Sequence, residues 1–439
     1  MDICVIAPAG DELRPEWLAR SISEAAEHMA AEAVLWVIAP RRLRPAAERA
    51  LRRNGLALVG GILTIPGWPD PAHLIPIAPA TLRDAGSRHL GLAPAVARAA
   101  GAIANMGIAR TLLRRGTRSC ALLATRRPRP DLLRWLGQLD GDRAATATVA
   151  TASRGEARIG VTLRFPPGTR APDLVVKIAF DEPGLDRLAR EREALVSLGG
   201  AAARAGAGVP RTRPMNIGWA LATEVLPGRP TAATLARAPR RLEPVGMAVA
   251  RWLTAWNSET AAATTATSEL LRARLLDPAD RVMDVAPGIA AYRERLGALA
   301  RRIEGERLVL VAAHNDLTMA NLLDADERIS VVDWEQAAPS CLPVTDLWYA
   351  LADGVARAHR IDHAQAVEAL ALGRAPAPAA LAAALRELVR AVSLTPNQAE
   401  LAFHACWLHH ASNELRRGES DGPFLAVVQA IASRRVSWP

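Results

Sequence analysis

The residues best suited to chemistry lie in segment 312–335, AAHNDLTMANLLDADERISVVDWE, where apolar runs enclose a few polar positions. A carboxylate can orient a hydroxyl group and accept its proton, so Asp316 is a candidate general base. Mg²⁺ prefers oxygen ligands, so the amide of Asn321 and the carboxylate of Asp333 are candidate metal ligands. Phosphoryl transfer to a hydroxyl group is one reaction that needs residues of these types.

The chain has a single lysine, Lys177, among 54 basic residues, and the other 53 are arginines. A compact ammonium group fits between phosphate oxygens and a carboxylate where a planar guanidinium does not. Lys177 stands on an apolar strand, DLVVKIAF, and is predicted to bind the α- and β-phosphates of ATP. Glu191 and Glu193 on the following helix are the candidate partners of its charge. Glu193 is favoured, because its position just before Ala194 and Leu195 suggests a face that packs onto the sheet.

These motifs resemble those of a known superfamily. HNDLTMANLL followed by VVDWE is similar to the HxDxxxxN and DxD or DxE motifs of the aminoglycoside phosphotransferases, choline kinases and homoserine kinases, which share the protein kinase fold. The resemblance extends over about residues 144–439. It implies that Asp316 is the catalytic base and that Asn321 and Asp333 bind Mg²⁺. It also implies that the lysine and its glutamate partner hold the phosphates of ATP.

The same resemblance implies further contacts to the nucleotide. The segment LATEVLPGRP resembles the hinge between the lobes of such kinases. There the backbone of Glu224 and Leu226 would bond the edge of adenine, with Thr223 at the back of the pocket. SRGEARIG stands where the loop that covers the phosphates belongs, and Gly155 is the one glycine in its turn.

Four residues near the base have implied supporting roles. His314 is a candidate catalytic residue, although a histidine two residues before the base more often forms structural hydrogen bonds. Asn315 stands where the superfamily usually has glycine, and asparagine tolerates unusual backbone angles. Asp346 resembles an acid that braces the catalytic loop. Glu335 ends the metal motif and is not assigned to the metal.

The pattern of apolar residues predicts an α+β chain, a two-lobed kinase-like fold preceded by a smaller α/β domain. The predicted parts are an α/β domain over 1–140, a small sheet lobe with the hinge over 141–230, and a helical lobe with the catalytic and metal loops over 231–439. Strands of the small lobe are predicted over 144–152, 157–165, 173–180 and 221–226, and a helix over 185–198. The Ala/Gly-rich stretch 199–209 is predicted as a loop, and further helices are predicted over 92–115 and 131–139.

Residues 1–140 weakly resemble the latter half of a class I methyltransferase, in which a strand and a basic helix precede a terminal hairpin. The glycine-rich loop that binds S-adenosylmethionine is absent, because IAPAGDEL offers only Gly10 after the first strand. We therefore expect a degenerate domain used for docking or substrate recruitment. Such fusions resemble proteins of surface-polysaccharide pathways, which points to a sugar or a glycan-linked acceptor.

Composition narrows the class of protein. The net charge is +9, but the arginines are scattered, so no nucleic-acid partner is expected. No stretch of about 20 apolar residues lacks charge, and the first residues do not form a signal peptide, so we expect a cytoplasmic protein without a membrane span. The four cysteines are too far apart for a structural zinc site.

The leading hypothesis is an ATP- and Mg²⁺-dependent small-molecule kinase whose acceptor is a sugar or glycoside. Two alternatives remain open: a catalytically silent kinase-like scaffold in a polysaccharide pathway, and a kinase that modifies aminoglycosides. The latter would require an acidic acceptor pocket, which a sequence does not reveal.

Overall fold

The computed structural model describes residues 3–6, 14–30, 33–65, 73–76, 119–126, 146–154, 157–165, 172–179, 181–206, 208–214, 219–325 and 328–433. The chain forms two compact units. The first comprises residues 1–192 and 212–225, and the second comprises residues 193–211 and 226–439. The predicted boundary near residue 140 does not coincide with this division and stays a prediction.

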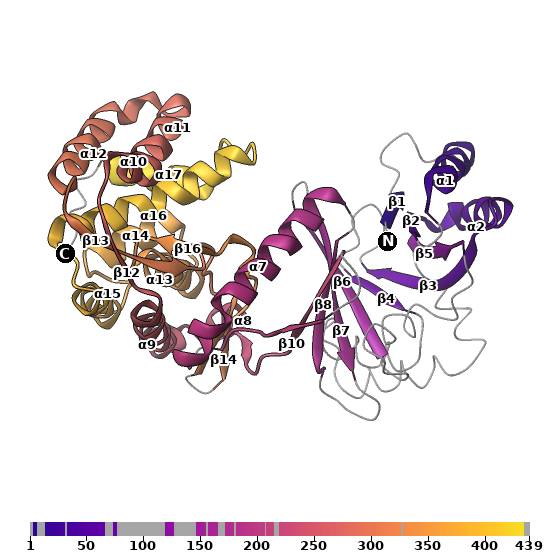
Figure 1. Cartoon of the computed structure of the whole chain (residues 1–439), viewed down its shortest axis with the longest axis horizontal. Coiled ribbons are helices and arrows are strands. Elements are labelled where there is room, and N and C mark those ends of the chain that lie inside the picture. The colour runs from indigo at the N-terminus through magenta and orange to yellow at the C-terminus, as the bar shows by residue number, and fades with distance from the viewer. Residues whose placement is uncertain are drawn as a thin grey trace. The chain divides into compact units, whose positions relative to one another are not determined.

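The first unit is built on one ten-stranded sheet in the order β1-β2-β5-β3-β4-β6-β7-β8-β10-β9 (Figure 1). Its strands are β1 (Ile3–Ile6), β2 (Val34–Pro40), β3 (Ala57–Ile65), β4 (His73–Pro76), β5 (Ser119–Thr125), β6 (Thr146–Arg154), β7 (Ala157–Phe165), β8 (Leu174–Ala179), β9 (Thr212–Arg213) and β10 (Ala220–Glu224). β4 joins β6 through His73 opposite Ala150 and Leu74 opposite Val149. Strands predicted for the first domain and strands predicted for the small lobe therefore belong to the same sheet.

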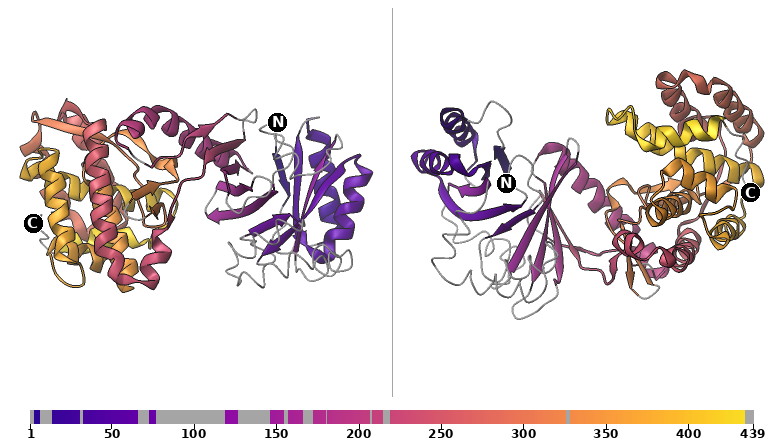
Figure 2. Two further views of the ribbon diagram at one scale, coloured as in Figure 1. Left: turned by 90° about the horizontal axis from the view of Figure 1, so that it is seen from below. Right: turned by 180° about the vertical axis from the view of Figure 1, so that it is seen from behind.

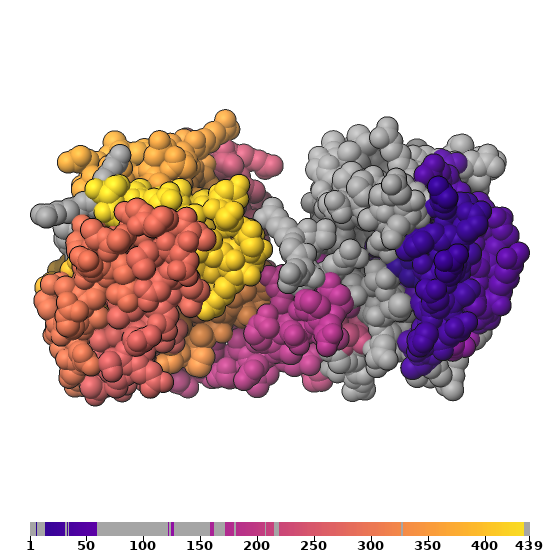
Figure 3. All heavy atoms as spheres, turned by 90° about the horizontal axis from the view of Figure 1, so that it is seen from above, coloured from indigo at the N-terminus to yellow at the C-terminus, as the bar shows by residue number. Residues whose placement is uncertain are grey.

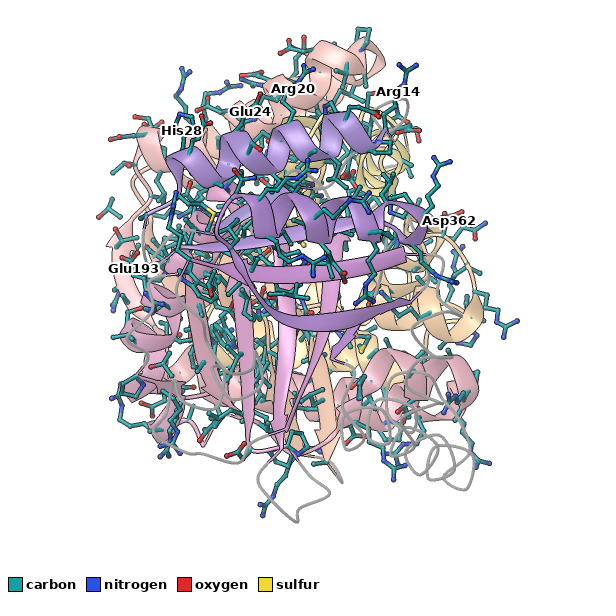
Figure 4. All side chains as sticks on the ribbon, turned by 90° about the vertical axis from the view of Figure 1, so that its right-hand side faces the viewer. Arg14, Arg20, Glu24, His28, Glu193 and Asp362 are labelled. Atoms are coloured by element: carbon teal, nitrogen blue, oxygen red, sulfur yellow. The ribbon has the colours of Figure 1, made fainter. Side chains whose placement is uncertain are left out.

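Helices α1 (Pro15–His28) and α2 (Arg44–Arg53) lie side by side on one face of the first part of this sheet (Figures 2 and 4). Leu18, Ile22 and Ala26 recur every four residues along α1 and are buried against the sheet. Each such leucine or isoleucine stabilises the fold by about 1.5–3 kcal/mol. The chain leaves α2 through Gly55, whose φ of 68° suits glycine at a helix end.

The last strands of the first unit carry the predicted lysine. β8 lies between β7 and β10, and Lys177 stands opposite Val161 on one side and Leu221 on the other. Helix α7 (Glu182–Arg204) follows β8 in the chain. The predicted loop over 199–209 is wrong for its first half, because the alanines there continue α7 to Arg204.

The second unit is mainly helical. Its helices are α8 (Thr231–Arg237), α9 (Leu242–Thr260), α10 (Ser268–Leu271), the π-helix η4 (Arg272–Leu276), α11 (Asp277–Val285), α12 (Ala290–Ile303), α13 (Thr345–His359), α14 (His363–Ala371), α15 (Ala379–Ala391), α16 (Pro396–Arg416) and α17 (Pro423–Ser433), with short 3₁₀ turns η3 (Pro239–Arg241), η5 (Pro287–Ile289) and η6 (Trp334–Gln336). Figure 3 shows α17, in yellow, beside the salmon segment of α11 and α12, on a face of this unit. Within the described residues, none of the helices combines the length and apolar character needed to cross a membrane.

Two small sheets in this unit hold the segment with the predicted chemistry. One has the order β12-β13-β16 and the other the order β11-β14-β15. Their strands are β11 (Arg229–Pro230), β12 (Ala262–Thr265), β13 (Arg307–Ala313), β14 (Leu322–Ala325), β15 (Arg328–Val331) and β16 (Ala338–Cys341). The apolar runs predicted around the catalytic segment are thus strands, and the polar residues stand at their ends.

The small-lobe strands predicted over 157–165, 173–180 and 221–226 are confirmed as β7, β8 and β10, with bounds shifted by at most two residues. The predicted helices over 92–115 and 131–139 lie outside the described residues. The mixture of helices with small antiparallel sheets agrees with the predicted α+β class.

Candidate active site

The catalytic loop runs from His314 to Asn321, between the end of β13 and the start of β14. The hairpin of β14 and β15 brings the two predicted metal ligands to the same end. Leu322 stands opposite Val331, and the amide of Val332 donates to the carbonyl of Asn321 at 3.0 Å. Asp333 is the next residue, with a left-handed backbone at φ 69°.

Asp316 is fixed by Asn321. The Nδ2 group of Asn321 donates to the Asp316 carbonyl at 2.9 Å and to Asp316 Oδ2 at 3.1 Å. Burial, with the charges of Asp333 and Glu335, raises the pKa of Asp316 to about 7, against the hydrogen bonds from Asn321 and Tyr349. A carboxyl group that ionises near neutral pH is suited to accept a proton.

The negative charges around Asp316 also favour the binding of a divalent cation. Asp316, Asp333 and Glu335 place negative charge close enough for two of them to raise the pKa of the third. A divalent cation relieves this repulsion, and the amide oxygen of Asn321 with the carboxylate of Asp333 is a donor set that Mg²⁺ accepts. The described residues contain no group of three or more His, Cys, Asp or Glu side chains arranged to hold a metal. Mg²⁺ would therefore need the phosphates of a nucleotide and water to complete its coordination.

His314 is fully buried, and both of its ring nitrogens bond to backbone. Nδ1 accepts from the amide of Asp316 at 3.2 Å, and Nε2 donates to the carbonyl of Val332 at 3.0 Å. The histidine thus ties the base to the strand that leads to Asp333. These contacts agree with the structural hydrogen bonds expected of a histidine at this position, and a catalytic role for His314 stays a prediction.

Asp346 braces the first residues of the loop. Its Oδ2 accepts from the amide of His314 at 2.7 Å, and its Oδ1 accepts from the amide of Asn315 at 2.9 Å. Burial raises the pKa of Asp346 to about 6, although these two bonds oppose the rise. Asn315 has φ 60°, which confirms the prediction that it occupies a position where glycine is common.

Helix α13 supplies two residues that sequence reasoning missed. Tyr349 donates its hydroxyl to Asp316 Oδ1 at 3.4 Å. Asp353 accepts the amide of Met319, inside the loop, at 2.8 Å and is held by Arg357. Asp346, Tyr349 and Asp353 follow at steps of three and four, which is one face of a helix, so this spacing was the available signal.

Tryptophans pack beneath the loop. Trp334, in the VVDWE motif, is fully buried and meets the ring of His314 edge-on at 4.9 Å. Trp256 packs against Trp334 at 5.3 Å, and its Nε1 donates to the carbonyl of Ala312 at 2.7 Å. This cluster of His314, Trp256 and Trp334 fixes both ends of the catalytic segment.

In the first unit, Lys177 pairs with Glu191 and not with Glu193. Its Nζ lies 2.8 and 2.7 Å from the two carboxylate oxygens of Glu191, whose side chain is 2% exposed. The prediction of Glu193 was wrong, because residues two positions apart lie on different faces of a helix. Glu191 shares the buried face of α7 with Leu188 and Leu195, whereas Glu193, labelled in Figure 4, is exposed.

The predicted hinge residues lie where the chain leaves the first unit. Thr223 is buried in β10 opposite Val175, and Glu224 ends that strand. Leu226 is the first residue of this stretch in the second unit. Gly155 lies outside the described residues. The structure thus gathers His314, Asp316, Asn321 and Asp333 in one unit, and Lys177 with its glutamate in the other.

No protein-family model and no curated protein matches the chain. Among solved structures, it is similar to a GDP complex of wild-type aminoglycoside 2'-phosphotransferase-IIIa, with 14% identity, a TM-score of 0.41, and coverage of 68% of this chain and 95% of that one. It is also similar to a choline/ethanolamine kinase family protein from Mesorhizobium loti, with 18% identity, a TM-score of 0.38, and coverage of 70% and 90%. A glucosamine kinase in complex with glucosamine, ADP and inorganic phosphate matches with 17% identity, a TM-score of 0.36, and coverage of 67% and 96%. Likenesses with TM-scores of 0.36–0.41 carry no conclusion about the activity of this chain.

Proposed function

We propose that the chain is a Mg²⁺-dependent phosphotransferase that moves the γ-phosphoryl group of ATP to a hydroxyl group of a small molecule, a sugar or glycoside. The observation that carries this proposal is the half-buried Asp316 carboxylate, fixed by Asn321 beside the charge of Asp333. A desolvated carboxylate with a pKa near 7 next to an amide and a second carboxylate is the arrangement that phosphoryl transfer to an alcohol requires.

In the proposed reaction, Asp316 orients the acceptor hydroxyl and takes its proton. The hydroxyl oxygen forms a bond to the γ-phosphorus, the bond from that phosphorus to the bridging oxygen breaks, and ADP leaves with the electron pair. Asn321 and Asp333 would hold Mg²⁺, which supplies positive charge to the phosphates when bound. His314 and Asp346 keep the loop in place during these steps.

Lys177 is assigned to the α- and β-phosphates. Glu191 holds its ammonium group through both carboxylate oxygens, so the lysine is fixed in direction before a nucleotide arrives. A buried glutamate bonded in this way favours the charged form of its partner. The backbone of Glu224 and Leu226 is assigned to adenine, on the resemblance of this segment to a kinase hinge.

The test is phosphoryl transfer by Asp316→Asn. ADP release is measured over a panel of sugars, glycosides and aminoglycosides. The variant should lose about 10²–10⁴-fold in turnover while it still binds ATP, because only the proton acceptor is removed. Asp284→Asn, on an exposed position of α11, is the matched control. Wild-type turnover in Asp316→Asn would remove Asp316 from its role, and nucleotide binding without any transfer by the wild type would favour the scaffold.

A further inference from the structure

A polar pocket lies beside the catalytic loop, within the second unit. It has a volume of about 60 Å³ and is lined by residues of η4, the start of α13 and the middle of α16, and by Asn315 of the loop. Asn315 directly precedes the proposed base. The pocket also reaches His410, whose ring stacks on that of Tyr349 at 3.7 Å, and Tyr349 donates to Asp316. Two separate routes thus connect this pocket to the proposed base.

Two of the side chains that line the pocket, Arg274 and His409, carry N–H groups that could donate to a ligand. Arg274 contributes a guanidinium group from the π-helical turn, and it is tethered to the carbonyl of Ser340. His409 contributes an imidazole whose Nε2 lies 2.9 Å from Nδ2 of Asn413. Because the asparagine amide donates to Nε2, the neutral ring carries its proton on Nδ1. A π-helical turn is itself a feature often found at functional sites.

The local charge is positive. Burial, with the neighbouring charges of Arg274, Arg416 and Arg281, lowers the pKa of His409 to about 4. Among the described residues that line the pocket, Asp346 is the one acid, and both of its oxygens accept backbone amides of the loop. An ammonium group in this pocket would therefore meet the guanidinium of Arg274, and the carboxylate of Asp346 is already bonded to the loop.

The size of the pocket limits what it holds. A volume of 60 Å³ accommodates a few water molecules, whereas pockets for whole drug-sized ligands measure about 300–1,000 Å³. The pocket is thus suited to one substituent of a ligand. Charge-assisted bonds from a guanidinium and an imidazole N–H favour a planar or tetrahedral oxyanion.

We propose that this pocket, formed by Arg274, His409 and the catalytic loop, receives a carboxylate or phosphate substituent of the phosphoryl acceptor. The inference rests on the proposed function and narrows it, since the acceptor becomes an anionic hydroxylated molecule such as a uronic acid or a sugar phosphate. It also disfavours polycationic aminoglycosides as the natural acceptor, because an ammonium group placed in this pocket would face the guanidinium of Arg274.

The first measurement is direct binding without ATP. D-glucuronate, glucose 6-phosphate, glucose and kanamycin are titrated into the full chain by calorimetry. We expect at least one anionic probe to bind more than tenfold tighter than glucose, and kanamycin not to compete with it. A preference for glucuronate over glucose 6-phosphate, or the reverse, identifies which oxyanion the pocket takes. Equal binding of glucose and both anions, or no binding of either anion, would overturn the proposal.

Substitutions at Arg274 test whether this residue binds the anionic group. Arg274→Gln should weaken binding of the anionic probe roughly 10–100-fold, the range expected for the loss of a charge-assisted hydrogen bond, and Arg274→Lys should restore part of it. Arg272→Gln is the control, because its side chain is 69% exposed and does not line the pocket. A thermal melt of each variant separates misfolding from lost binding. Unchanged binding of the anion to a folded Arg274→Gln protein would contradict the inference.

Transfer assays separate this inference from the proposed function. If anionic acceptors are phosphorylated and Arg274→Gln raises their KM but leaves kcat unchanged, the result supports both the kinase proposal and the assignment of the pocket. If neutral or cationic sugars are phosphorylated as well as anions, the function stands and the pocket assignment fails. If the anion binds through Arg274 but no acceptor is phosphorylated, the pocket stands and the kinase proposal fails.

Discussion

At the scale of single residues, the most informative feature is how completely the loop around Asp316 is tied to its surroundings. Asn321 holds the carboxylate, His314 accepts its amide, and Tyr349 donates to its second oxygen. A reacting group held by several partners needs little reorganisation when the reaction begins. The loop is therefore ordered before substrate binds.

Tyr349→Phe tests the contribution of one hydroxyl group. Removing the donor to Asp316 should lower kcat about 3–10-fold and leave the KM for ATP unchanged, since the hydrogen bond holds the base and not the nucleotide. Tyr292→Phe is the matched control, because Tyr292 is the other tyrosine of the chain and its buried hydroxyl bonds His404 at 3.0 Å, away from Asp316. Equal kcat in the two variants would show that Tyr349 only packs.

The lysine pair gives a second test. Glu191→Gln should weaken ATP binding about tenfold or more, because the ammonium loses the carboxylate that fixes it in a buried place. Glu193→Gln, on the exposed face two residues away, should bind ATP as the wild type does. Lys177→Arg should also be damaging, since the guanidinium does not fit beside Glu191 as an ammonium does. Fluorescence titration with a nucleotide analogue measures all three, and equal effects of the two glutamate changes would contradict the assignment.

The sequence predicted the site residues that lie close together in the chain, and it missed those whose role depends on the phase of a helix or on a helix elsewhere in the chain. The types and spacing of Asp316, Asn321 and Asp333 pointed to one site because they lie on a short segment between strands. Glu191 was missed as the favoured partner because its assignment depends on helix phase, and Leu188 and Leu195 three and four residues away carried that information. Tyr349 was missed because it reaches the loop from a helix that follows much later in the chain.

At the scale of elements, α13 and α16 carry much of the support for the loop. α13 presents Asp346 and Asp353 to backbone amides of the loop, and α16 packs its histidines and aromatic residues behind it. Trp348 on α13 meets Phe403 on α16 at 4.8 Å. Small changes in the packing of these two helices should therefore reach Asp316.

Helix α16 should make the fold sensitive to acid. Burial lowers the pKa of His409 to about 4 and holds that of His410 well below its usual range. Between about pH 6.5 and 4 these two histidines bind more protons in the unfolded chain than in the folded one, so their contribution to stability is present above pH 6.5 and is lost as the pH falls. In His409→Gln, the free energy of unfolding in urea should depend on pH less steeply, by up to about 1.4 kcal/mol per unit.

The control for this experiment is His359→Gln, at an exposed position at the end of α13. Both variants are compared with the wild type at pH 7.5, 6 and 5. Asp316 and Asp346, whose raised pKa values act in the opposite direction, are present in all three proteins and cancel in the comparison. A slope for His409→Gln equal to that of the wild type would contradict the burial of this imidazole as the cause.

The helices and strands that were predicted best are those whose bounds depend only on the local pattern of apolar residues. β7 and β8 appear within two residues of their predicted bounds, because alternation and turn residues are local signals. The end of α7 was predicted too early, since glycines at 199 and 200 suggested a stop that the following alanines override. The helices supporting the loop could be expected, but the π-helical turn η4 had no sequence signal.

At the scale of the whole molecule, the first unit continues one sheet from the N-terminal strands into the strands that carry Lys177. The connection runs through β4 and β6, where two residue pairs are matched. Such long-range pairing leaves no local signature, so a separate domain over 1–140 was the natural prediction from pattern alone.

A shortened chain of residues 141–439 tests whether the pairing of β4 with β6 is needed for folding and for ATP binding. Because His73 and Leu74 are the two residues that pair with β6 in the described part of β4, the shortened chain should fold and bind ATP within about threefold of the full chain, with a modestly lower melting temperature. Circular dichroism and calorimetry measure both quantities. An unfolded or aggregated product would mean that the N-terminal strands are an integral part of the nucleotide-binding unit, and the boundary at 140 would be wrong.

The most direct test of the central claim is calorimetric binding of ATP, with and without Mg²⁺, to the wild type and to Asp333→Ala. The proposed site predicts that the wild type binds ATP more tightly with Mg²⁺ and that Asp333→Ala loses this dependence while it still binds the nucleotide. A folded wild-type protein that binds no ATP under either condition would contradict the account, and the chain would then be a kinase-like scaffold.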